Sequence, residues 1–234
     1  REKCIFALIL LFFLESAARM PVYASQDFAS LPPSRMTASV DLSTFFEGYD
    51  GCFALYDSRE NQWLLYNKKQ CAQRTAPEST YKIYSALLGL EKKIITPDST
   101  FMAWDGRPHA IGQWNKDQTL ASAMQDSVNW YFQELDKRAG TEAMKEFYAG
   151  LGYGNQDFSN DSSSLWLGSS LKISAIEQVE LLRKLYHNEY HFSPENIQAV
   201  QNSIKLEEKP GGTLYGKTGT GNIDGENRNG WFIG

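Results

Sequence analysis

Two runs of apolar residues separated by a short polar stretch open the folded part of the chain. The runs are "GCFALYDS" and "QWLLYN", within residues 51–67, and both are rich in aromatic and aliphatic side chains. Apolar runs of this length on either side of a charged turn are typical of a β-hairpin. We therefore expect two antiparallel strands here.

Helical periodicity follows in the middle of the chain. Apolar side chains recur at spacings of i, i+3, i+4 and i+7, which places them on one face of a helix. The first such set is Ile83, Ala86, Leu87 and Leu90. The second, with Thr141 as its expected N-cap, is Met144, Phe147, Tyr148 and Leu151. Both segments are predicted to be amphipathic helices.

Two more helices are marked by the residues that start them. Ser174 and Glu177 have the spacing of a capping box, in which each side chain bonds the other residue's backbone N–H. Ser193 followed by Pro194 combines an N-cap with a first-turn proline. Residues 209–234 then contain strand-like runs around a glycine-rich turn. Strands at both ends with helices between them predict a single α+β domain over 37–234, with an antiparallel sheet closed by the two chain ends.

The segment before this domain has a different character. A basic start precedes an uninterrupted apolar run from Cys4 to Leu14, and small residues follow near Ala24. The run is shorter than the roughly 20 residues that span a bilayer, and it fits the apolar part of a signal peptide. Because the sequence does not begin with Met, residues 1–24 are alternatively the end of a transmembrane helix. Either interpretation places the domain outside the cytoplasm, after a linker at 25–36.

Composition and charge exclude some functions. The net charge of −5 leaves no basic surface for nucleic acid. The three cysteines are too few for a disulfide framework, although a bridge between Cys52 and Cys71 stays open. His187 and His191 have the spacing of a zinc-binding helix, but Glu189 is one position too late for the metalloprotease pattern. We therefore expect no metal and no nucleic-acid partner.

The strongest chemical signal lies in "PESTYKIYSALLGL", residues 77–90. Ser79 and Lys82 stand three positions apart at the start of the predicted helix. Side chains at i and i+3 share one helix face and are close enough to touch. Burial and the positive end of the helix both disfavour an ammonium, so a neutral lysine can accept the serine proton. The pair therefore predicts an activated serine nucleophile.

Other motifs distinguish this pair from a chance occurrence. Ser169 and Lys172 form a second Ser-x-x-Lys, which we interpret as part of a polar strand or loop without a catalytic role. The first pair is followed by "SVN" at 127–129, on a predicted helix, and then by "KTG" at 217–219, on a late strand, whereas no "SVN" follows the second pair. This order matches the signature of serine β-lactamases and penicillin-binding proteins.

The "SVN" motif supplies two polar side chains next to the nucleophile. Ser127 can relay a proton between Ser79, Lys82 and the leaving nitrogen of the substrate. Asn129 can bond Lys82 or a substrate amide. Both roles require the motif to lie beside the Ser-x-x-Lys turn.

The "KTG" strand supplies the binding groups. Lys217 carries a positive charge for a substrate carboxylate, and the hydroxyl of Thr218 orients it. Gly219 is expected to let a ligand approach the strand closely. The backbone N–H groups of Ser79 and Thr220 form the expected oxyanion hole.

The resemblance extends beyond these motifs and covers residues 41–234. "STYKIYSALLGLE", "WDG" (104–106), "YGN" (153–155), "SSLKIS" (169–174) after Trp166, and "GKTGTG…GWFIG" resemble class D β-lactamases. They are more similar still to the sensor domains of the BlaR/MecR family. The resemblance implies an all-helical subdomain beside a five-stranded antiparallel sheet, with the site in the cleft between them.

Three residue roles follow from this resemblance alone. Lys82 resembles the lysine that takes up carbon dioxide to become a carbamate base. Trp166 resembles the tryptophan that packs on this carbamate and hydrogen-bonds it, with a plain core tryptophan as the alternative. Asn129 departs from the class D enzymes, which resemble one another in having an apolar residue there, usually Val. We expect its amide to favour loss of carbon dioxide after acylation, so that the acyl-enzyme persists.

Three functions remain open on the sequence. The favoured one is a membrane-anchored sensor, acylated on Ser79 by β-lactam antibiotics, that signals the induction of resistance. The second is a secreted class D β-lactamase, and the third is a cell-wall transpeptidase, a carboxypeptidase or an inert relative. The sensor family also has an upstream zinc-protease domain, whose His-Glu-x-x-His motif does not occur in this sequence. The resemblance further implies another strand and a terminal helix after residue 234.

Overall fold

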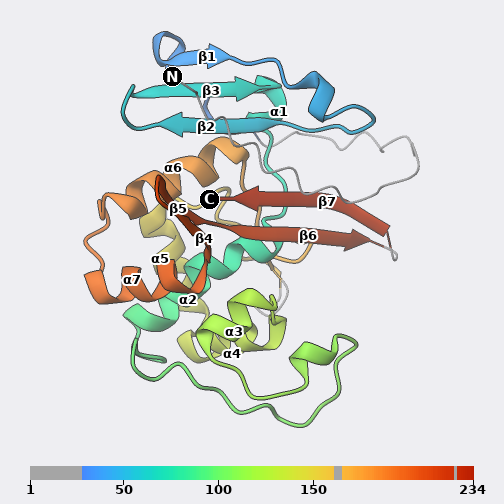
Figure 1. Ribbon diagram of the computed structural model, residues 1–234. Helices are drawn as coiled ribbons and strands as arrows, with labels where there is room; N and C mark the ends of the chain where they lie inside the picture. Colours follow the sequence, from blue (N-terminus) through green and yellow to red (C-terminus); the bar gives the residue numbers. More distant parts are fainter. Residues whose placement is uncertain (1–27, 161–164, 224–225) are drawn as a thin grey trace.

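The computed structural model describes residues 28–160, 165–223 and 226–234. The predicted hydrophobic segment 1–24 lies outside these ranges. Within them, no helix is long and apolar enough to cross a membrane. Figure 1 shows strands β1 to β3 at one end of the molecule, α3 and α4 at the opposite end, and α2 between them.

The described strands lie towards both ends of the chain with the α-helices between them, as expected for an α+β domain, which confirms the predicted fold class. The strands are β1 (Thr37–Ser39), β2 (Phe53–Asp57), β3 (Gln62–Tyr66), β4 (Lys205–Lys209), β5 (Gly212–Tyr215), β6 (Lys217–Ile223) and β7 (Glu226–Ile233). The α-helices are α1 (Lys68–Ala72), α2 (Lys82–Glu91), α3 (Leu120–Gln125), α4 (Asn129–Ala139), α5 (Thr141–Leu151), α6 (Ala175–Tyr186) and α7 (Pro194–Ser203). Short 3₁₀ turns are η1 (Ser34–Met36), η2 (Ser43–Phe45), η3 (Glu78–Tyr81) and η4 (Gly112–Trp114).

The strands of the described residues form three separate sheets. The predicted hairpin β2–β3 is antiparallel, with Phe53 opposite Tyr66, and β1 joins β3 in parallel. The strand pairs β4–β5 and β6–β7 are each antiparallel. The single five-stranded antiparallel sheet implied by the resemblance is therefore not present as one ladder. Instead, β1 pairs in parallel with β3, and the two C-terminal strand pairs, β4–β5 and β6–β7, form no ladder with any other described strand.

Helix α2 forms the centre of the larger core. Every side chain from Lys82 to Leu90 is buried, so the helix is enclosed on all sides, although its sequence pattern indicated one apolar face. Helices α4 and α7 pack against it. Gly89 makes the contact with α4 close, because a Cβ there would lie 2.8 Å from a methyl carbon of Leu135. The predicted nucleophile and base therefore stand on a rigid support.

A smaller core lies between the three-stranded sheet and α6. Its buried members are Trp63, Leu65, Cys71, Ala72 and Ile176. Both described cysteines, Cys52 and Cys71, are free thiols. The Sγ of Cys71 instead lies within hydrogen-bond distance of two backbone carbonyls, those of Phe53 (3.2 Å) and Tyr66 (3.1 Å), and its single S–H can donate to either. The bridge that the sequence left open is not formed here.

The helix starts show which capping signals were sufficient. The box at Ser174 is confirmed: its Oγ accepts from the N–H of Glu177 at 3.2 Å, and the Glu177 carboxylate accepts from the N–H of Ser174 at 3.0 Å. Helix α7 also begins at Pro194. The N-cap predicted for α5 is wrong, because Thr141 is already its first helical residue and Gly140 is the cap. Gly140 has a φ of 81°, a conformation that favours glycine over threonine.

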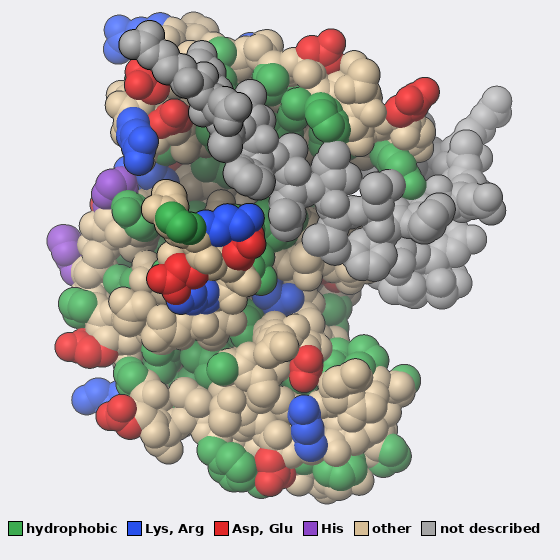
Figure 2. Space-filling view, viewed as in Figure 1, with side chains coloured by type: hydrophobic (Ala, Val, Ile, Leu, Met, Phe, Trp, Pro, Cys, Tyr) green, Lys and Arg blue, Asp and Glu red, His purple; other side chains and the backbone are tan. Residues whose placement is uncertain are grey.

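The connection between α2 and α3 runs over the surface at the lower end of the molecule. It exposes Phe101 (60%) and Ile111 (46%) to solvent. Figure 2 shows hydrophobic side chains along this lower rim, while acidic and basic side chains are interspersed over the face in view. No single-sign patch of charge covers the described part of that face.

Candidate active site

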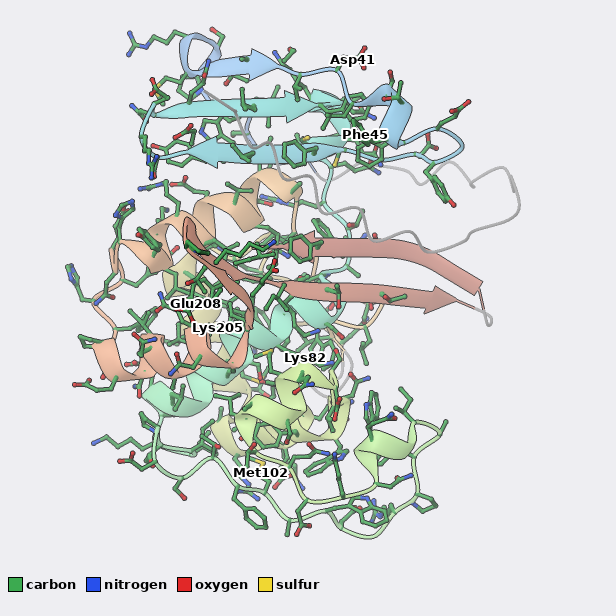
Figure 3. The ribbon with its side chains drawn as sticks, in the orientation of Figure 1. Asp41, Phe45, Lys82, Met102, Lys205 and Glu208 are labelled. Carbon is green, nitrogen blue, oxygen red and sulfur yellow. The ribbon has the colours of Figure 1, made fainter. Side chains whose placement is uncertain are left out.

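The predicted nucleophile and base meet at the junction of η3 and α2. Ser79 lies in η3, and α2 begins at Lys82, so one continuous helical turn carries both side chains. Lys82 Nζ is 2.8 Å from Ser79 Oγ. Figure 3 places Lys82 in the middle of the molecule, between strand β6 and helix α3. The turn thus delivers the serine and the amine to one point.

Four oxygen atoms surround the Lys82 amine. Besides Ser79 Oγ, they are Ser127 O at 2.7 Å, Ser127 Oγ at 3.0 Å and Asn129 Oδ1 at 2.7 Å. The carbonyl of Ser127 and the amide oxygen of Asn129 can only accept. A neutral amine donates its two N–H groups to these two oxygens and keeps its lone pair for the Ser79 hydroxyl. This is the arrangement of a general base directed at Ser79.

The electrostatics favour this neutral form. Burial lowers the pKa of Lys82 well below its usual range, and the nearby charge of Lys217 lowers that pKa further. Glu78 opposes the effect. Because an ammonium is costly to bury next to another cation, Lys82 can act as a proton acceptor near neutral pH.

Ser127 lies at the predicted place but in an unexpected conformation. It precedes α4 instead of lying on a helix, in the short link after α3, and its φ is 54°. A serine in the left-handed region is uncommon and is held there by its surroundings. Its Oγ lies 3.0 Å from Lys82 Nζ and 3.0 Å from Lys217 Nζ. The hydroxyl therefore bridges the two amines, as a proton relay requires.

Strand β6 presents alternate residues to opposite sides. Lys217 and Gly219 are buried, whereas Thr218 and Thr220 are exposed. Lys217 Nζ also donates to the backbone carbonyl of Thr218 at 2.9 Å. Burial lowers the pKa of Lys217 to about 8, so it retains its charge at neutral pH. The two threonine hydroxyls lie on the open side, where a substrate carboxylate could reach them.

Gly219 faces the η3 turn, whereas the sequence analysis expected it to face a ligand. A Cβ at this position would lie 3.1 Å from the Pro77 carbonyl oxygen and 3.2 Å from the Ser79 nitrogen. The missing side chain therefore lets β6 approach η3, and it does not face the open side of the strand. This close approach brings β6 beside the backbone of Ser79, which is where the predicted oxyanion hole with Thr220 has to form.

Trp166 packs directly against the base. It is fully buried, and its ring stacks on Tyr81 with centroids 5.4 Å apart and planes 10° apart. Lys82 Nζ lies over the ring, 5.0 Å from its centroid. The indole N–H of Trp166 has no hydrogen-bond partner. Trp166 is therefore part of the site, and it presents its ring face to the amine.

The loop that carries Trp166 is fixed by the "YGN" turn. Asn155 donates through Nδ2 to the carbonyl of Ser170 (2.9 Å) and accepts at Oδ1 from the N–H of Lys172 (2.9 Å). Ser169 and Lys172, the second Ser-x-x-Lys pair, belong to this loop, and Lys172 is exposed. The pair therefore lies in a loop, as the sequence analysis predicted.

Two buried carboxyl groups near the site were not among the predicted residues. Glu78 directly precedes the nucleophile, is 3% exposed and accepts from the N–H of Gly168 at 3.1 Å. Asp136 is 1% exposed and accepts from Ser85 Oγ at 2.7 Å. The sequence offered only their positions as signals: Glu78 is next to the serine, and Asp136 is two helical turns after Asn129. Neither position distinguishes a buried carboxyl group from a solvated one.

A carbamate on Lys82 agrees with some of these contacts and not with others. The lowered pKa of Lys82 and the unpartnered indole N–H of Trp166 fit it. Carboxylation, however, leaves a single N–H on Nζ, so either Ser127 O or Asn129 Oδ1 would lose its donor. An unpaired buried acceptor costs about 1–3 kcal/mol. The two acceptor oxygens, Ser127 O and Asn129 Oδ1, therefore favour the amine over the carbamate.

Among the described residues, no group of three or more candidate metal ligands occurs.

Comparisons with known proteins agree with this site. The profile of the penicillin-binding protein transpeptidase domain family matches residues 51–234. The regulatory protein BlaR1 of Bacillus licheniformis is 43% identical over 236 residues, which cover 100% of this chain and 39% of that protein. The methicillin resistance protein MecR1 of Staphylococcus aureus is 40% identical and is matched over 82% of this chain and 33% of its own length. The chain thus spans less than half the length of these relatives.

Solved structures give the same grouping. The C-terminal domain of the Bacillus licheniformis BlaR penicillin-receptor is similar with a TM-score of 0.83 and 44% identity, over 87% of this chain and 83% of that domain. The probable β-lactamase YbxI of Bacillus subtilis is 41% identical over 81% of this chain and 70% of its own length. The chain therefore belongs to the penicillin-binding protein transpeptidase domain family and, within it, to the BlaR/MecR group of β-lactam sensor domains related to the class D β-lactamases.

Proposed function

We propose that this chain is the ligand-binding domain of a membrane receptor, which β-lactams acylate on Ser79 and which keeps the acyl group long enough to signal the induction of resistance. Kinship with BlaR1 and MecR1 supports the β-lactam-sensing role. The observation that carries the finer proposal is the contact of Asn129 Oδ1 with Lys82 Nζ at 2.7 Å. It links the base to an acceptor that an apolar residue could not replace.

Acylation follows from the geometry around Ser79. Ser79 Oγ attacks the β-lactam carbonyl carbon while its proton moves to Lys82 Nζ, 2.8 Å away. The negative charge that develops on the carbonyl oxygen is stabilised by the backbone N–H groups of Ser79 and Thr220. The C–N bond of the ring then breaks, and its nitrogen receives the proton from Lys82 through Ser127. The product is a ring-opened ester on Ser79, with Lys82 again neutral.

Binding before this step relies on strand β6. Lys217 attracts the carboxylate that penicillins and cephalosporins carry, and the exposed hydroxyls of Thr218 and Thr220 can bond it. Because Lys217 also contacts Ser127 Oγ at 3.0 Å, its positive charge helps to keep the relay hydroxyl oriented. Recognition and proton transfer thus share one side chain.

The ester on Ser79 persists because of the groups that surround Lys82 after acylation. Hydrolysis needs a group that removes a proton from water next to the ester carbonyl. Asn129 and the Ser127 carbonyl bind the N–H groups of Lys82 and favour the amine, or the ammonium, over the carbamate that class D enzymes use. Deacylation is therefore slow, and one drug molecule occupies the domain for a long time.

Intact-mass spectrometry of the protein from residue 25 onward tests this proposal. The protein is mixed with benzylpenicillin and followed over hours, with Ser79→Ala as the control. A single penicilloyl adduct on Ser79 that outlasts a cell generation supports a receptor. No adduct on the unaltered chain would refute it.

The identity to YbxI, matched over 70% of that protein, keeps a hydrolytic function as the second candidate. A class D β-lactamase would show a transient adduct while penicillin is consumed catalytically. The same experiment therefore separates the two functions by the lifetime of the adduct.

Localisation and the rest of the receptor belong to the proposal as well. BlaR1 and MecR1 are more than twice as long as the region matched here. We propose that the domain faces outside the cytoplasm, anchored through residues 1–24, and that a zinc-protease domain precedes it in the complete receptor. Protease protection of the intact protein in membrane vesicles of defined orientation checks this topology.

A further inference from the structure

Glu78 directly precedes the nucleophile and is buried, although the acylation chemistry does not use it. The residue is only 3% exposed. Its backbone N–H donates to the carbonyl of Trp166 at 3.1 Å, and its Oε1 accepts from the N–H of Gly168 at 3.1 Å. The backbone and the side chain of Glu78 are therefore both tied to the loop that carries Trp166.

Strand β6 packs directly on the Glu78 side chain. A Cβ at Gly219 would lie 3.2 Å from Glu78 Cβ. A Cβ at Gly221 would lie 2.6 Å from Glu78 Oε1 and 3.0 Å from the carboxyl carbon, which is closer than a real Cβ can approach. The strand reaches its position because these two buried residues lack side chains, and Glu78 is the surface against which both of them rest.

This packing controls where the two proposed oxyanion donors lie. The first donor, the N–H of Ser79, follows Glu78 directly in the chain. The second, the N–H of Thr220, lies between Gly219 and Gly221 on β6. Residues i and i+2 of a strand face the same side, so the two glycines fix the distance of Thr220 from η3. The side chain of Glu78 thus acts as a spacer between the two donors.

The backbone of Glu78 depends on the same contacts. Its φ is 51°, in the left-handed region that a glutamate adopts only rarely. A residue in such a conformation persists where its surroundings hold it. Loss of the contacts with Gly168 and with β6 would let this backbone relax, and the N–H of Ser79, which comes next in the chain, would turn with it.

We propose that Glu78 is a positioning residue that sets the separation of the N–H groups of Ser79 and Thr220, and so aligns the oxyanion hole for acylation. This inference rests on the proposed acylation of Ser79 and adds a residue that does not touch the ligand. It depends on the size of the Glu78 side chain and on its bond to Gly168, both of which glutamine reproduces and alanine does not.

Stopped-flow acylation of the chain by a chromogenic cephalosporin tests the idea, because it separates the dissociation constant of the initial complex from the rate constant of the acylation step. Loss of a complete oxyanion donor slows a reaction by about 100- to 1000-fold. For displaced donors we expect Glu78→Ala to lower the acylation rate constant by about 10- to 100-fold, with the dissociation constant changed by less than about threefold. Glu78→Gln should stay within about threefold of the unaltered chain in both constants.

Gly221→Ala changes the same contact from the side of the strand. Its Cβ would meet Glu78 Oε1 at 2.6 Å, so β6 has to move away and the acylation rate constant should fall. The loss should shrink when Glu78→Ala, or the shorter Glu78→Asp, is present as well, because the crowded carboxyl group is then removed or withdrawn. Non-additivity of this kind measures direct coupling between two positions.

Gly230→Ala is the matched control for the strand. Gly230 lies opposite Thr220 in the β6–β7 ladder and has open space around a Cβ, so neither constant should change. Thermal unfolding shows whether each variant is folded. If Glu78→Ala is not, the combination of Gly221→Ala with Glu78→Asp still decides the question.

A second measurement needs no ligand. A Cβ at Gly219 would lie 3.2 Å from the Ser79 nitrogen, so one Hα of Gly219 points at the Ser79 amide. We expect a nuclear Overhauser effect between this Hα and the Ser79 amide proton in the unaltered chain and in Glu78→Gln. In Glu78→Ala the effect should be lost.

Several results would overturn the inference. One is an unchanged acylation rate constant in a folded Glu78→Ala variant, and another is a loss of equal size in Glu78→Gln. A third is strict additivity of Gly221→Ala with the substitutions of Glu78. A fourth is an Overhauser effect that persists in Glu78→Ala. Failure of the proposed function looks different: the unaltered chain would not be acylated on Ser79, while the Overhauser effect would still depend on Glu78.

Discussion

Asn129 Oδ1 accepts a hydrogen bond from Lys82 Nζ at 2.7 Å, across the interface between helices α4 and α2. The contact joins the proposed base, Lys82, to Asn129, the residue at which the resemblance implies a departure from the class D enzymes. Because we propose that this hydrogen bond slows deacylation, its contribution can be measured by the lifetime of the acyl group on Ser79.

Replacing Asn129 by Val should convert the domain towards a hydrolase. The substitution removes an acceptor that favours the amine, and a hydrogen bond between neutral groups contributes about 0.5–1.5 kcal/mol. We therefore expect deacylation to accelerate by up to about tenfold, measured by the loss of the penicilloyl mass over time. Asn129→Asp, which keeps an acceptor-only atom against Lys82, is the control and should give no gain. An unchanged lifetime in the Val variant would refute this account.

Acylation should decline in alkaline solution because of Lys217. Burial lowers the pKa of Lys217 to about 8, so the ammonium is present below that pH and is lost as the pH rises through it. An anionic penicillin then loses its main electrostatic partner. We expect the second-order acylation rate constant, measured with a chromogenic cephalosporin, to fall above about pH 8.

The matched variant for this prediction is Lys217→Arg. A guanidinium stays charged throughout the accessible range, so the alkaline decline should disappear even if the rate at neutral pH is lower. A profile for the unaltered chain that stays flat well beyond the pKa of Lys217 would show that this charge does not govern binding.

Glu78 should make folding stability depend on pH. Burial raises the pKa of Glu78 from 4.5 to about 7. Between these values the folded protein holds a proton that the unfolded chain has released, so the free energy of unfolding decreases as the pH rises through this window. Glu78→Gln keeps an acceptor for the Gly168 N–H and removes the ionisation. We expect it to raise the free energy of unfolding by about 1–3 kcal/mol at alkaline pH.

Urea unfolding at acidic and alkaline pH measures this difference. The gain from Glu78→Gln should vanish at a pH below the ordinary value for glutamate, because both states are then protonated. Glu47→Gln, at an exposed position, is the control and should change little at either pH. A gain of equal size under both conditions would point to packing instead of charge.

The turn that supports the Trp166 loop should tolerate no side chain. Gly154 has a φ of 52°, and a Cβ there would lie 1.9 Å from the Lys172 carbonyl oxygen. Gly154→Ala should therefore lower the free energy of unfolding by at least about 2 kcal/mol. Gly150 in α5 has open space around a Cβ. Gly150→Ala should raise stability slightly, by up to about 1 kcal/mol. Equal effects of the two substitutions, measured by thermal unfolding, would contradict the prediction.

Features that depend on neighbouring residues could be predicted from the sequence. The hairpin β2–β3, helix α2 and the capping box at Ser174 all follow from short spacings. The contact of Ser79 with Lys82 is of the same kind, since one helical turn produces it. The roles proposed for the "SVN" and "KTG" motifs needed the resemblance as well, because their distance from the serine is not encoded in any spacing.

Features that depend on packing could not be predicted. The burial of Lys217, the left-handed conformation of Ser127 and the contact of the buried Asp136 with Ser85 arise from contacts between distant segments. Gly219 illustrates the limit well: a glycine on a strand indicates a close approach, but only the fold shows that η3 is what approaches. The start of α5 was missed for a local reason, because threonine and glycine compete as caps and the backbone there needs a positive φ.

Because α4 and β6 have different proposed roles, mutations in these two elements would alter different properties of such a receptor during evolution. In the proposed mechanism, strand β6 holds the groups that bind the ligand, whereas α4 holds Asn129, which contacts Lys82 and touches no ligand. Substitutions on α4 would therefore change how long a response lasts, and substitutions on β6 would change which compounds elicit it. Duration and selectivity can then be adjusted by mutation independently of each other.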